Sequence, residues 1–421
     1  MASSKPIPPS TDNDNDTVTA SRRDDPGQPA SSAAIEWISR LIAIDTTSRQ
    51  SNLGLIEAVR DDLRSHGVHA WLDYDASGAK ANLFATLPAS DGRTQGGIVL
   101  SGHTDVVPVD GQDWHSPPFA PTVRNGRLYG RGACDMKGFI GTVMSRVPAW
   151  CATPPGVPVH LAFSYDEEVG CLGVSPMLAA MARRNIRPQG CVVGEPTGMR
   201  VIVAHKGINI YRCCVHGHAA HSSLTPRGVN AIEYAARLIC HIRDVADAFA
   251  ANGPYDDGFD VPFSTAQTGT ISGGIALNTI PAACEFVFEY RNLPGVDADA
   301  VFARIEAFAA QTLIPEMARV HPNATIRFTK IAAPPSMKAP ASAPFVQLMH
   351  ALTRDTAARK VSYGTEAGFF QRAGIPTVVC GPGSIEQAHQ PDEFVALAEI
   401  ARCERFLSKL IAPSTRASTL I

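Results

Sequence analysis

The sequence has no long hydrophobic run, no large excess of charge of one sign and no cysteine spacing typical of a metal site. No apolar segment approaches the ~18 residues that a membrane-spanning helix needs. The 37 Lys and Arg residues and 40 Asp and Glu residues give a formal charge of −3, which excludes the basic surface typical of nucleic-acid or anionic-membrane binding. We therefore expect a cytoplasmic protein without a nucleic-acid or membrane partner.

The cysteines and the N-terminal segment also lack the marks of an exported protein. The ten cysteines are scattered, mostly in apolar contexts, and predict free thiols in a reducing compartment rather than a disulfide framework. The first 32 residues have few large apolar side chains, and no apolar segment follows a basic start, which excludes a secretory signal. We expect residues 1–32 to form a disordered tail.

The remaining chain has an ordinary composition, 45% hydrophobic and 18% charged, and its 421 residues are enough for two or three domains. Strand and helix patterns alternate over residues 33–205, which favours an α/β layer with a mostly parallel sheet. Residues 206–332 follow the order β-α-β-β-α-β of the ferredoxin-like α+β fold. Residues 333–421 return to helix and strand. We therefore predict a catalytic α/β domain, residues 33–205 and 333–421, interrupted by an inserted α+β domain.

The element boundaries follow from hydrophobic spacing and from turn residues, with Ser32 as the expected N-cap of the first helix. Helices are expected over residues 33–42, 52–66, 138–150, 172–185, 230–249, 297–314, 344–354 and 397–411, and strands over residues 70–74, 82–87, 97–101, 157–164, 191–194, 208–215, 268–272, 285–291, 325–331 and 377–380.

Two motifs in the first half place possible metal ligands at a strand end and in a turn. SGHTDVVPV follows an apolar strand and carries His103 and Asp105, which point to the same face of an extended backbone. A metal-bound histidine usually donates its second ring N–H to a carboxylate, and Asp105 is placed to accept it. In YGRGACDMKG, Asp135 lies in a glycine-flanked turn that opens a helix. There it could bridge two metal ions or simply cap the helix.

Acidic side chains and a second histidine follow later predicted strands. LAFSYDEEVG has three consecutive acids after a strand, and like charges resist burial unless a cation is present. Glu167 and Glu168 should project in different directions, so that one can bind metal while the other acts as a base. VVGEPTG places Glu195 at the edge where α/β sites assemble, and GPGSIEQAHQPDE places His389 in a polar loop.

Each motif alone has an ordinary explanation, such as a helix cap, a solvated acidic turn or a loop histidine. Their joint placement favours a site, because four of the five segments follow strands or strand-to-helix turns of one predicted sheet. Two histidines and three carboxylates suit two borderline divalent ions, zinc above all, with cobalt or manganese as alternatives. The sequence therefore predicts a hydrolytic site with two divalent metal ions.

From about residue 33 to residue 412, the chain resembles the two-zinc aminoacylase and carboxypeptidase family of metallopeptidase-like hydrolases. SGHTDVVPV, GRGACDMKG, DEEVG and GEPT match the metal motifs of this family in order. SYGTEAGFF, followed by GPGSIEQAHQPDE, looks most like its acetylornithine deacetylase branch. The resemblance implies a two-zinc exopeptidase-like catalytic domain with an inserted lid and dimerisation domain.

The resemblance also implies a role for each matched residue. It assigns His103 and Glu195 to one metal ion, Glu168 and His389 to the other, Asp135 to both, the general base to Glu167, and the orientation of His103 to Asp105. It further implies a cis peptide bond after Asp135.

In the inserted domain, VHGHAAHSSLTPRGVNAI resembles the lid segment of the family. His221 matches a histidine that reaches the site of the neighbouring subunit and steadies the oxyanion, so a homodimer through the lid domain is implied. Asn278 and Arg291 match positions that meet the carboxylate of the substrate. Glu366, a single acid beside glycines and aromatic residues, is our hypothesis for the partner of a substrate ammonium group.

The expected reaction is hydrolysis of N2-acetyl-L-ornithine, a small N-acetyl amino acid, to L-ornithine and acetate, a step of arginine biosynthesis. A broader N-acyl-amino-acid amidohydrolase (aminoacylase) and a carboxypeptidase are the alternatives within the family, and a desuccinylase would be expected to carry a different turn in place of SYGTEAGF. A catalytically inactive metal-binding scaffold is the alternative from another class. It would be expected to lack a ligand or Glu167, and here all are present.

Overall fold

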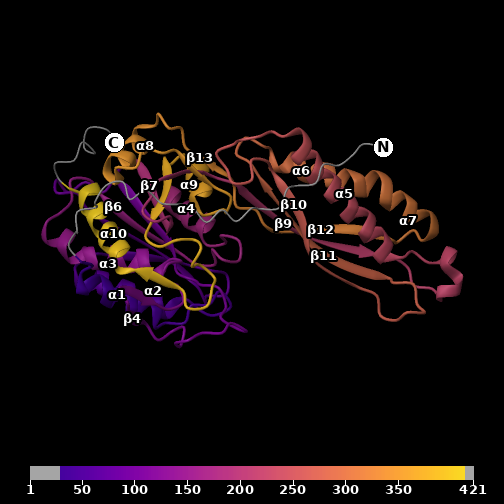
Figure 1. The fold of residues 1–421 in the computed structure, drawn as a ribbon, viewed down its shortest axis with the longest axis horizontal. Helices are drawn as coiled ribbons and strands as arrows, with labels where there is room; N and C mark the ends of the chain where they lie inside the picture. Colours follow the sequence, from indigo (N-terminus) through magenta and orange to yellow (C-terminus); the bar gives the residue numbers. More distant parts are fainter. Residues whose placement is uncertain (1–28, 413–421) are drawn as a thin grey trace, which may run out of the picture.

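The computed structural model describes residues 29–412 as two lobes, each built on its own β-sheet (Figure 1). The larger sheet has nine strands in the order β1-β2-β6-β3-β7-β15-β8-β13, with β14 paired to β8. The smaller sheet has four strands in the order β10-β11-β9-β12, and a short three-stranded sheet joins β16, β5 and β4. The expected disordered tail falls almost entirely outside the described residues.

The larger lobe is formed by two separate parts of the chain. Its helices are α1 (Ser32–Ile42), α2 (Leu53–Ser65), α3 (Lys137–Ala152), α4 (Val174–Arg183), α8 (Pro344–Thr353), α9 (Ala367–Arg372) and α10 (Leu397–Leu410). Its strands are β1 (Ala70–Tyr74), β2 (Ala81–Leu87), β3 (Ile98–His103), β4 (Thr122–Arg124), β5 (Arg127–Tyr129), β6 (Val159–Ser164), β7 (Gly190–Pro196), β8 (Ile202–His205), β13 (Met337–Lys338), β14 (Arg359–Val361), β15 (Thr377–Gly381) and β16 (Phe394–Ala396).

The smaller lobe lies between β8 and β13 in the sequence. It contains the strands β9 (Gly207–His216), β10 (Thr265–Gly273), β11 (Ala283–Asn292) and β12 (Thr325–Ala332). Its helical segments are η1 (Ser222–Arg227), α5 (Ala231–Asn252), α6 (Ala298–Phe308), the π-helical turn η2 (Ala309–Leu313) and α7 (Ile314–Val320).

The larger sheet is parallel at its centre and antiparallel toward its margins. Neighbours β6, β3, β7 and β15 run parallel, whereas β2 pairs antiparallel with both β1 and β6. The central strands are buried along their whole length, as expected for strands covered on both faces. Helix α3 packs against β3 and β7 and is covered by α1 and α10. This arrangement confirms the predicted α/β layer.

The smaller sheet is entirely antiparallel and buries one of its faces. Residues of β9 and β11 alternate between buried and more exposed positions, the pattern of a sheet with one covered face. Helices α5, α6 and α7 lie over one side of this sheet in Figure 1 and share its apolar core. The order β-α-β-β-α-β and the strand arrangement confirm the expected ferredoxin-like α+β lobe.

Several local details differ from the sequence prediction. Ser31, not Ser32, caps α1, because its side chain accepts a hydrogen bond from the N–H of Ala34. The helix expected over residues 297–314 continues to Val320 through η2. The short strands β4, β5, β8, β13, β14 and β16 were not predicted, since two to four residues carry little periodic signal. All ten cysteines are free thiols, and no described helix is long and apolar enough to cross a membrane.

Candidate active site

The predicted metal ligands come from the carboxyl ends of neighbouring parallel strands. His103 is the last residue of β3, Glu195 lies near the end of β7, and Glu167 and Glu168 lie in the turn after β6. His389 lies in the loop after β15. Because parallel strands place their carboxyl ends at one edge of a sheet, these segments converge there. These side chains therefore lie at one edge of the larger sheet.

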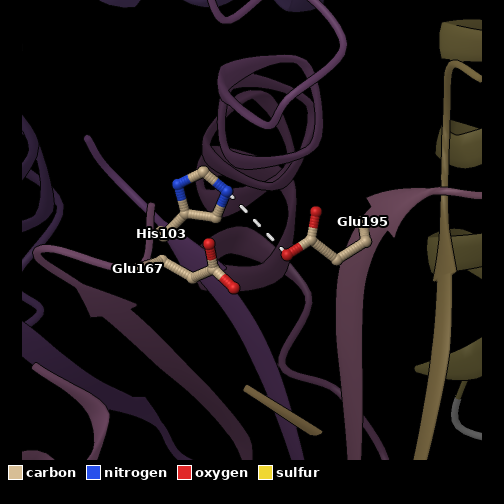
Figure 2. Close-up of side chains that lie close together, drawn as sticks. All are labelled: His103, Glu167 and Glu195. Atoms are coloured by element: carbon tan, nitrogen blue, oxygen red, sulfur yellow. Dashed lines mark ion pairs between the residues drawn. The ribbon is translucent and has the colours of Figure 1, made fainter. Parts of the chain in front are cut away.

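His103 lies at the centre of the cluster. Its Nε2 atom is 2.9 Å from Oδ1 of Asp135 and 3.8 Å from Oε1 of Glu195. Figure 2 shows the carboxylates of Glu167 and Glu195 turned toward the His103 ring, and these three residues offer ligand atoms within 4.8 Å of one another. Glu167 therefore lies within the same 4.8 Å as the predicted ligand Glu195, and proximity alone does not separate a ligand from a base.

His389 approaches the same cluster from the opposite side of Asp135. Its Nε2 atom is 3.0 Å from Oε2 of Glu168 and 3.3 Å from Oδ2 of Asp135. The two oxygens of Asp135 thus face different histidines, Oδ1 toward His103 and Oδ2 toward His389. A carboxylate in this position can bridge two ions.

The turn that carries Asp135 is held by Glu393. The carboxylate of Glu393 accepts hydrogen bonds from the N–H groups of Gly132 (3.0 Å), Cys134 (2.9 Å) and Asp135 (3.0 Å). It also pairs with Nη1 of Arg131 at 2.7 Å, and both side chains are 1% exposed. The peptide bond between Asp135 and Met136 is cis, as the resemblance implied.

Asp105 contacts His103 differently from the prediction. The backbone carbonyl of Asp105 lies 2.9 Å from Nδ1 of His103, whereas its Oδ1 atom is 3.6 Å away. The carboxylate instead accepts the N–H groups of Glu167 (3.0 Å) and Glu168 (3.3 Å) and the hydroxyl of Ser48 (2.7 Å). Asp105 therefore links the ring of His103 to the acidic turn after β6.

The buried carboxylates of the cluster need additional positive charge nearby to be stable as anions. Burial raises the pKa of Glu167 to about 8 and that of Glu168 to about 7. Burial also raises the pKa of Glu195 well above its ordinary value, and the neighbouring Asp135 carboxylate adds to this. Hydrogen bonds to Asp135 and Glu168 raise the pKa of His389 to about 10. Buried carboxylates at this density are stable as anions only with cations between them, so the donor set fits two divalent ions.

Glu366 lies within electrostatic range of Glu167 and His103 but is 1% exposed. Its Oε2 atom is 3.5 Å from the hydroxyl of Ser101, and Oε1 has no hydrogen-bond partner among residues 29–412. Burial raises the pKa of Glu366 to about 7. Glu366 is therefore buried beside the cluster, where its charge acts on His103 and Glu167, and its role toward a substrate ammonium group stays a prediction.

The lid residues do not join the cluster within one chain. Arg291 lies at the end of β11 next to the larger lobe, and the register pairs it with Ile208 at the start of β9. His221 and Asn278 lie beyond the opposite end, where the N–H of Ser222 donates to the carbonyl of Asn278 at 3.0 Å. The eight residue-to-residue steps from Ile208 to His216 span about 26 Å at ~3.3 Å per residue. His221 is therefore remote from Arg291 in the same chain.

Sequence reasoning missed Arg131, Glu393 and Ser48. Glu393 lies within the stretch used to identify His389, but its partners are about 260 positions earlier in the chain, a pairing that no local pattern reveals. The one available signal is Arg131 itself, a charged residue inside a turn of small and apolar residues. Ser48 offers no comparable signal.

Comparison with known proteins agrees with this geometry. The sequence model of peptidase family M20/M25/M40 matches residues 99–412. The acetylornithine deacetylase of Pasteurella multocida (strain Pm70) is 35% identical over 385 residues, covering 90% of this chain and 97% of that protein. An M20 family metallo-carboxypeptidase from Sulfolobus solfataricus has a TM-score of 0.69 at 16% identity, covering 91% of this chain and 99% of the other. A dinuclear metal-binding M20 family peptidase from Bacillus subtilis has a TM-score of 0.58 at 15% identity, covering 90% and 96%. The chain belongs to peptidase family M20/M25/M40 and is a metal-dependent hydrolase.

Proposed function

We propose that this protein hydrolyses the amide bond of N2-acetyl-L-ornithine, releasing L-ornithine and acetate. The observation that carries the proposal is the cluster in which Asp135 faces both His103 and His389, with Glu167, Glu168 and Glu195 around it. The 35% identity to an acetylornithine deacetylase over 90% of the chain supports the choice of substrate.

The ligand assignment that we propose uses the pairs seen in the cluster. His103 and Glu195 would hold one ion, Glu168 and His389 the other, and Asp135 both. Zinc is the preferred ion for this donor set, and cobalt is an alternative. Two such ions would polarise the scissile carbonyl and an attacking water molecule.

Glu167 is our proposed general base. Its N–H is fixed by Asp105 at 3.0 Å, and its carboxylate faces His103 and Glu195. A buried carboxylate whose pKa is raised toward neutrality both accepts and returns a proton readily. Glu167 would take a proton from water and deliver it to the departing amine nitrogen.

The lid would supply the remaining contacts. Arg291 lies at the end of the lid sheet nearest the larger lobe, and its planar guanidinium suits a substrate carboxylate; Asn278 is a second candidate. His221 is too far along the sheet to serve its own cluster, so we propose that it reaches the site of a second subunit. Large apolar side chains near the same tip are exposed, Ile275 at 91% and Leu277 at 102%, which supports a homodimer through the lid.

Steady-state kinetics with a panel of acyl amino acids tests the proposal. We expect the highest kcat/KM for N2-acetyl-L-ornithine over N-acetylmethionine, N-succinyl-diaminopimelate and dipeptides with a free N-terminus. Comparable rates on many N-acyl amino acids would identify an aminoacylase instead, and preference for the dipeptides would identify a peptidase. No turnover with metal fully bound would indicate a scaffold.

A further inference from the structure

We propose that Glu289, on the helix-free face of the lid sheet, selects substrates whose side chain carries a positive charge. This inference rests on the proposed function, because it assumes that Arg291 binds the carboxylate of an N-acyl amino acid. Glu289 would bind the positively charged side chain at the other end of the same substrate.

Glu289 and Arg291 form an ion pair inside a small cavity. Nη2 of Arg291 lies 3.2 Å from Oε2 of Glu289, and Nε2 of Gln267 donates to Oε1 of Glu289 at 2.9 Å. With Thr265 and Ala266, these residues line a cavity of about 220 Å³ between β10 and β11. A single cation and a single anion thus share one ligand-sized space.

This cavity lies at the end of the lid sheet nearest the larger lobe. Arg291 is the register partner of Ile208, and Ile208 packs so closely on Gly364 that an added Cβ there would lie 2.7 Å from its Cδ1 atom. Gly364 is two residues before Glu366 in the sequence. On the other side, Ala332 at the end of β12 packs against Gly170, which is two residues after Glu168. The base of the lid therefore rests on two loops that carry residues of the site.

Exchange of ion pairs explains how Glu289 would discriminate between substrates. A substrate carboxylate that takes Arg291 leaves Glu289 without its cation, and the Glu289 side chain is only 21% exposed. A partly buried charge without a partner is unfavourable. A substrate with a side-chain ammonium group gives Glu289 a new cationic partner, whereas a substrate with an uncharged side chain does not.

Once their ion pair is separated, the backbone spacing of the two residues suits such a substrate. Residues two apart on a strand point to the same face and lie ~6.6 Å apart. In an extended ornithine, the carboxylate carbon and the side-chain nitrogen are separated by five bonds of ~1.5 Å, which in a zigzag chain span roughly 6 Å end to end. One molecule can therefore contact both Arg291 and Glu289.

The same strand offers a matched control. Glu285 lies on the same face of β11, farther from the larger lobe, and pairs with Nε of Arg212 at 3.2 Å. The side chains of this distal pair are 46% and 52% exposed, against 32% and 21% for the Arg291–Glu289 pair. Glu285→Gln thus makes the same chemical change where no substrate contact is expected.

The test compares N2-acetyl-L-ornithine with N-acetyl-L-norvaline, which has the same carbon chain without the ammonium group. In Glu289→Gln we expect the ratio of kcat/KM values for the two substrates to fall at least roughly tenfold, the effect of one charge-assisted hydrogen bond. The loss should lie in KM for acetylornithine, with the norvaline derivative unchanged or improved. Glu285→Gln should leave the ratio unchanged, and metal content should match wild type in both variants.

An unchanged ratio of kcat/KM values in Glu289→Gln would overturn the role of Glu289 while leaving the proposed function intact. This holds whether both values stay at the wild-type level or both fall by the same factor. An equal loss would mean that Glu289 only positions Arg291. If the wild-type protein with metal bound cleaves neither substrate, the proposed function fails, and the inference fails with it.

Discussion

Replacement of Glu393 by glutamine should weaken both the fold and the metal site. The carboxylate accepts three backbone N–H groups and the guanidinium of Arg131, with all four contacts between 2.7 and 3.0 Å. A glutamine side chain keeps one acceptor oxygen, so its amide N–H₂ group would face donors on the other side. Arg131, 1% exposed, would also remain as a buried cation without a counter-charge.

The size of the effect follows from those contacts. Breaking a buried ion pair by removing one partner typically costs about 3–5 kcal/mol, and the unsatisfied buried donors fall within that range. We expect a decrease of this order in the free energy of unfolding. Because Glu393 fixes the N–H of Asp135, we also expect metal affinity to fall about 10–100-fold, as for other residues that orient metal ligands.

Urea unfolding of the metal-free protein measures the first effect, and metal content after dialysis against a graded chelator measures the second. Glu386→Gln is the control, because Glu386 is exposed in the same loop and should shift stability by no more than about 0.5 kcal/mol. A Glu393→Gln protein within 1 kcal/mol of the control and with unchanged metal affinity would refute the role assigned to Glu393.

Three further perturbations test other parts of the site and fold. Glu167→Gln should lower kcat by at least about 10²-fold, the usual contribution of a general base, while its metal content stays near wild type. Glu168→Gln should instead lose metal. Loss of metal in Glu167→Gln, measured by elemental analysis, would mean that Glu167 is a metal ligand. A mixture of inactive Glu167→Gln and His221→Ala chains should regain about a quarter of wild-type activity after subunit exchange, because half of the dimers have one complete site; no recovery in dimers shown to exchange would refute a shared site. Burial lowers the pKa of His205 to about 4. Between about pH 6.5 and pH 4 the unfolded chain therefore binds more protons than the folded chain. The free energy of unfolding should fall as pH decreases through this range, by up to ~3 kcal/mol from this group. Unfolding curves of His205→Asn at pH 7.5 and 5 should show a smaller loss, and an equal loss would exclude His205 as a source.

The metal-ligand segments were predictable because each one carries a local mark. His103, the acids at Glu167 and Glu168, and Glu195 all follow apolar runs that end abruptly in polar residues. In a parallel sheet such ends meet at one edge, so the strand pattern alone places these side chains together.

Contacts between distant segments were not predictable in this way. Glu393 is recognisable in the sequence only as one more acid near His389, yet it holds the turn of Asp135 through three backbone N–H groups. Glu366 lies in a turn of glycines and aromatic residues that pointed to substrate, and the structure buries it. Burial depends on what packs over a residue, and for Glu366 that includes Ser101 from a strand more than 260 positions earlier.

By itself the sequence determined the alternation of strands and helices, the inserted α+β lobe and the set of side chains available to bind metal, because these follow from local periodicity and residue chemistry. The tertiary structure alone decided which oxygen of Asp135 faces which histidine, which carboxylates are cut off from solvent, and that Arg291 and Glu289 share a cavity of the smaller lobe. These features depend on distances of a few ångströms between segments far apart in the chain, and only the tertiary packing within each lobe sets such distances.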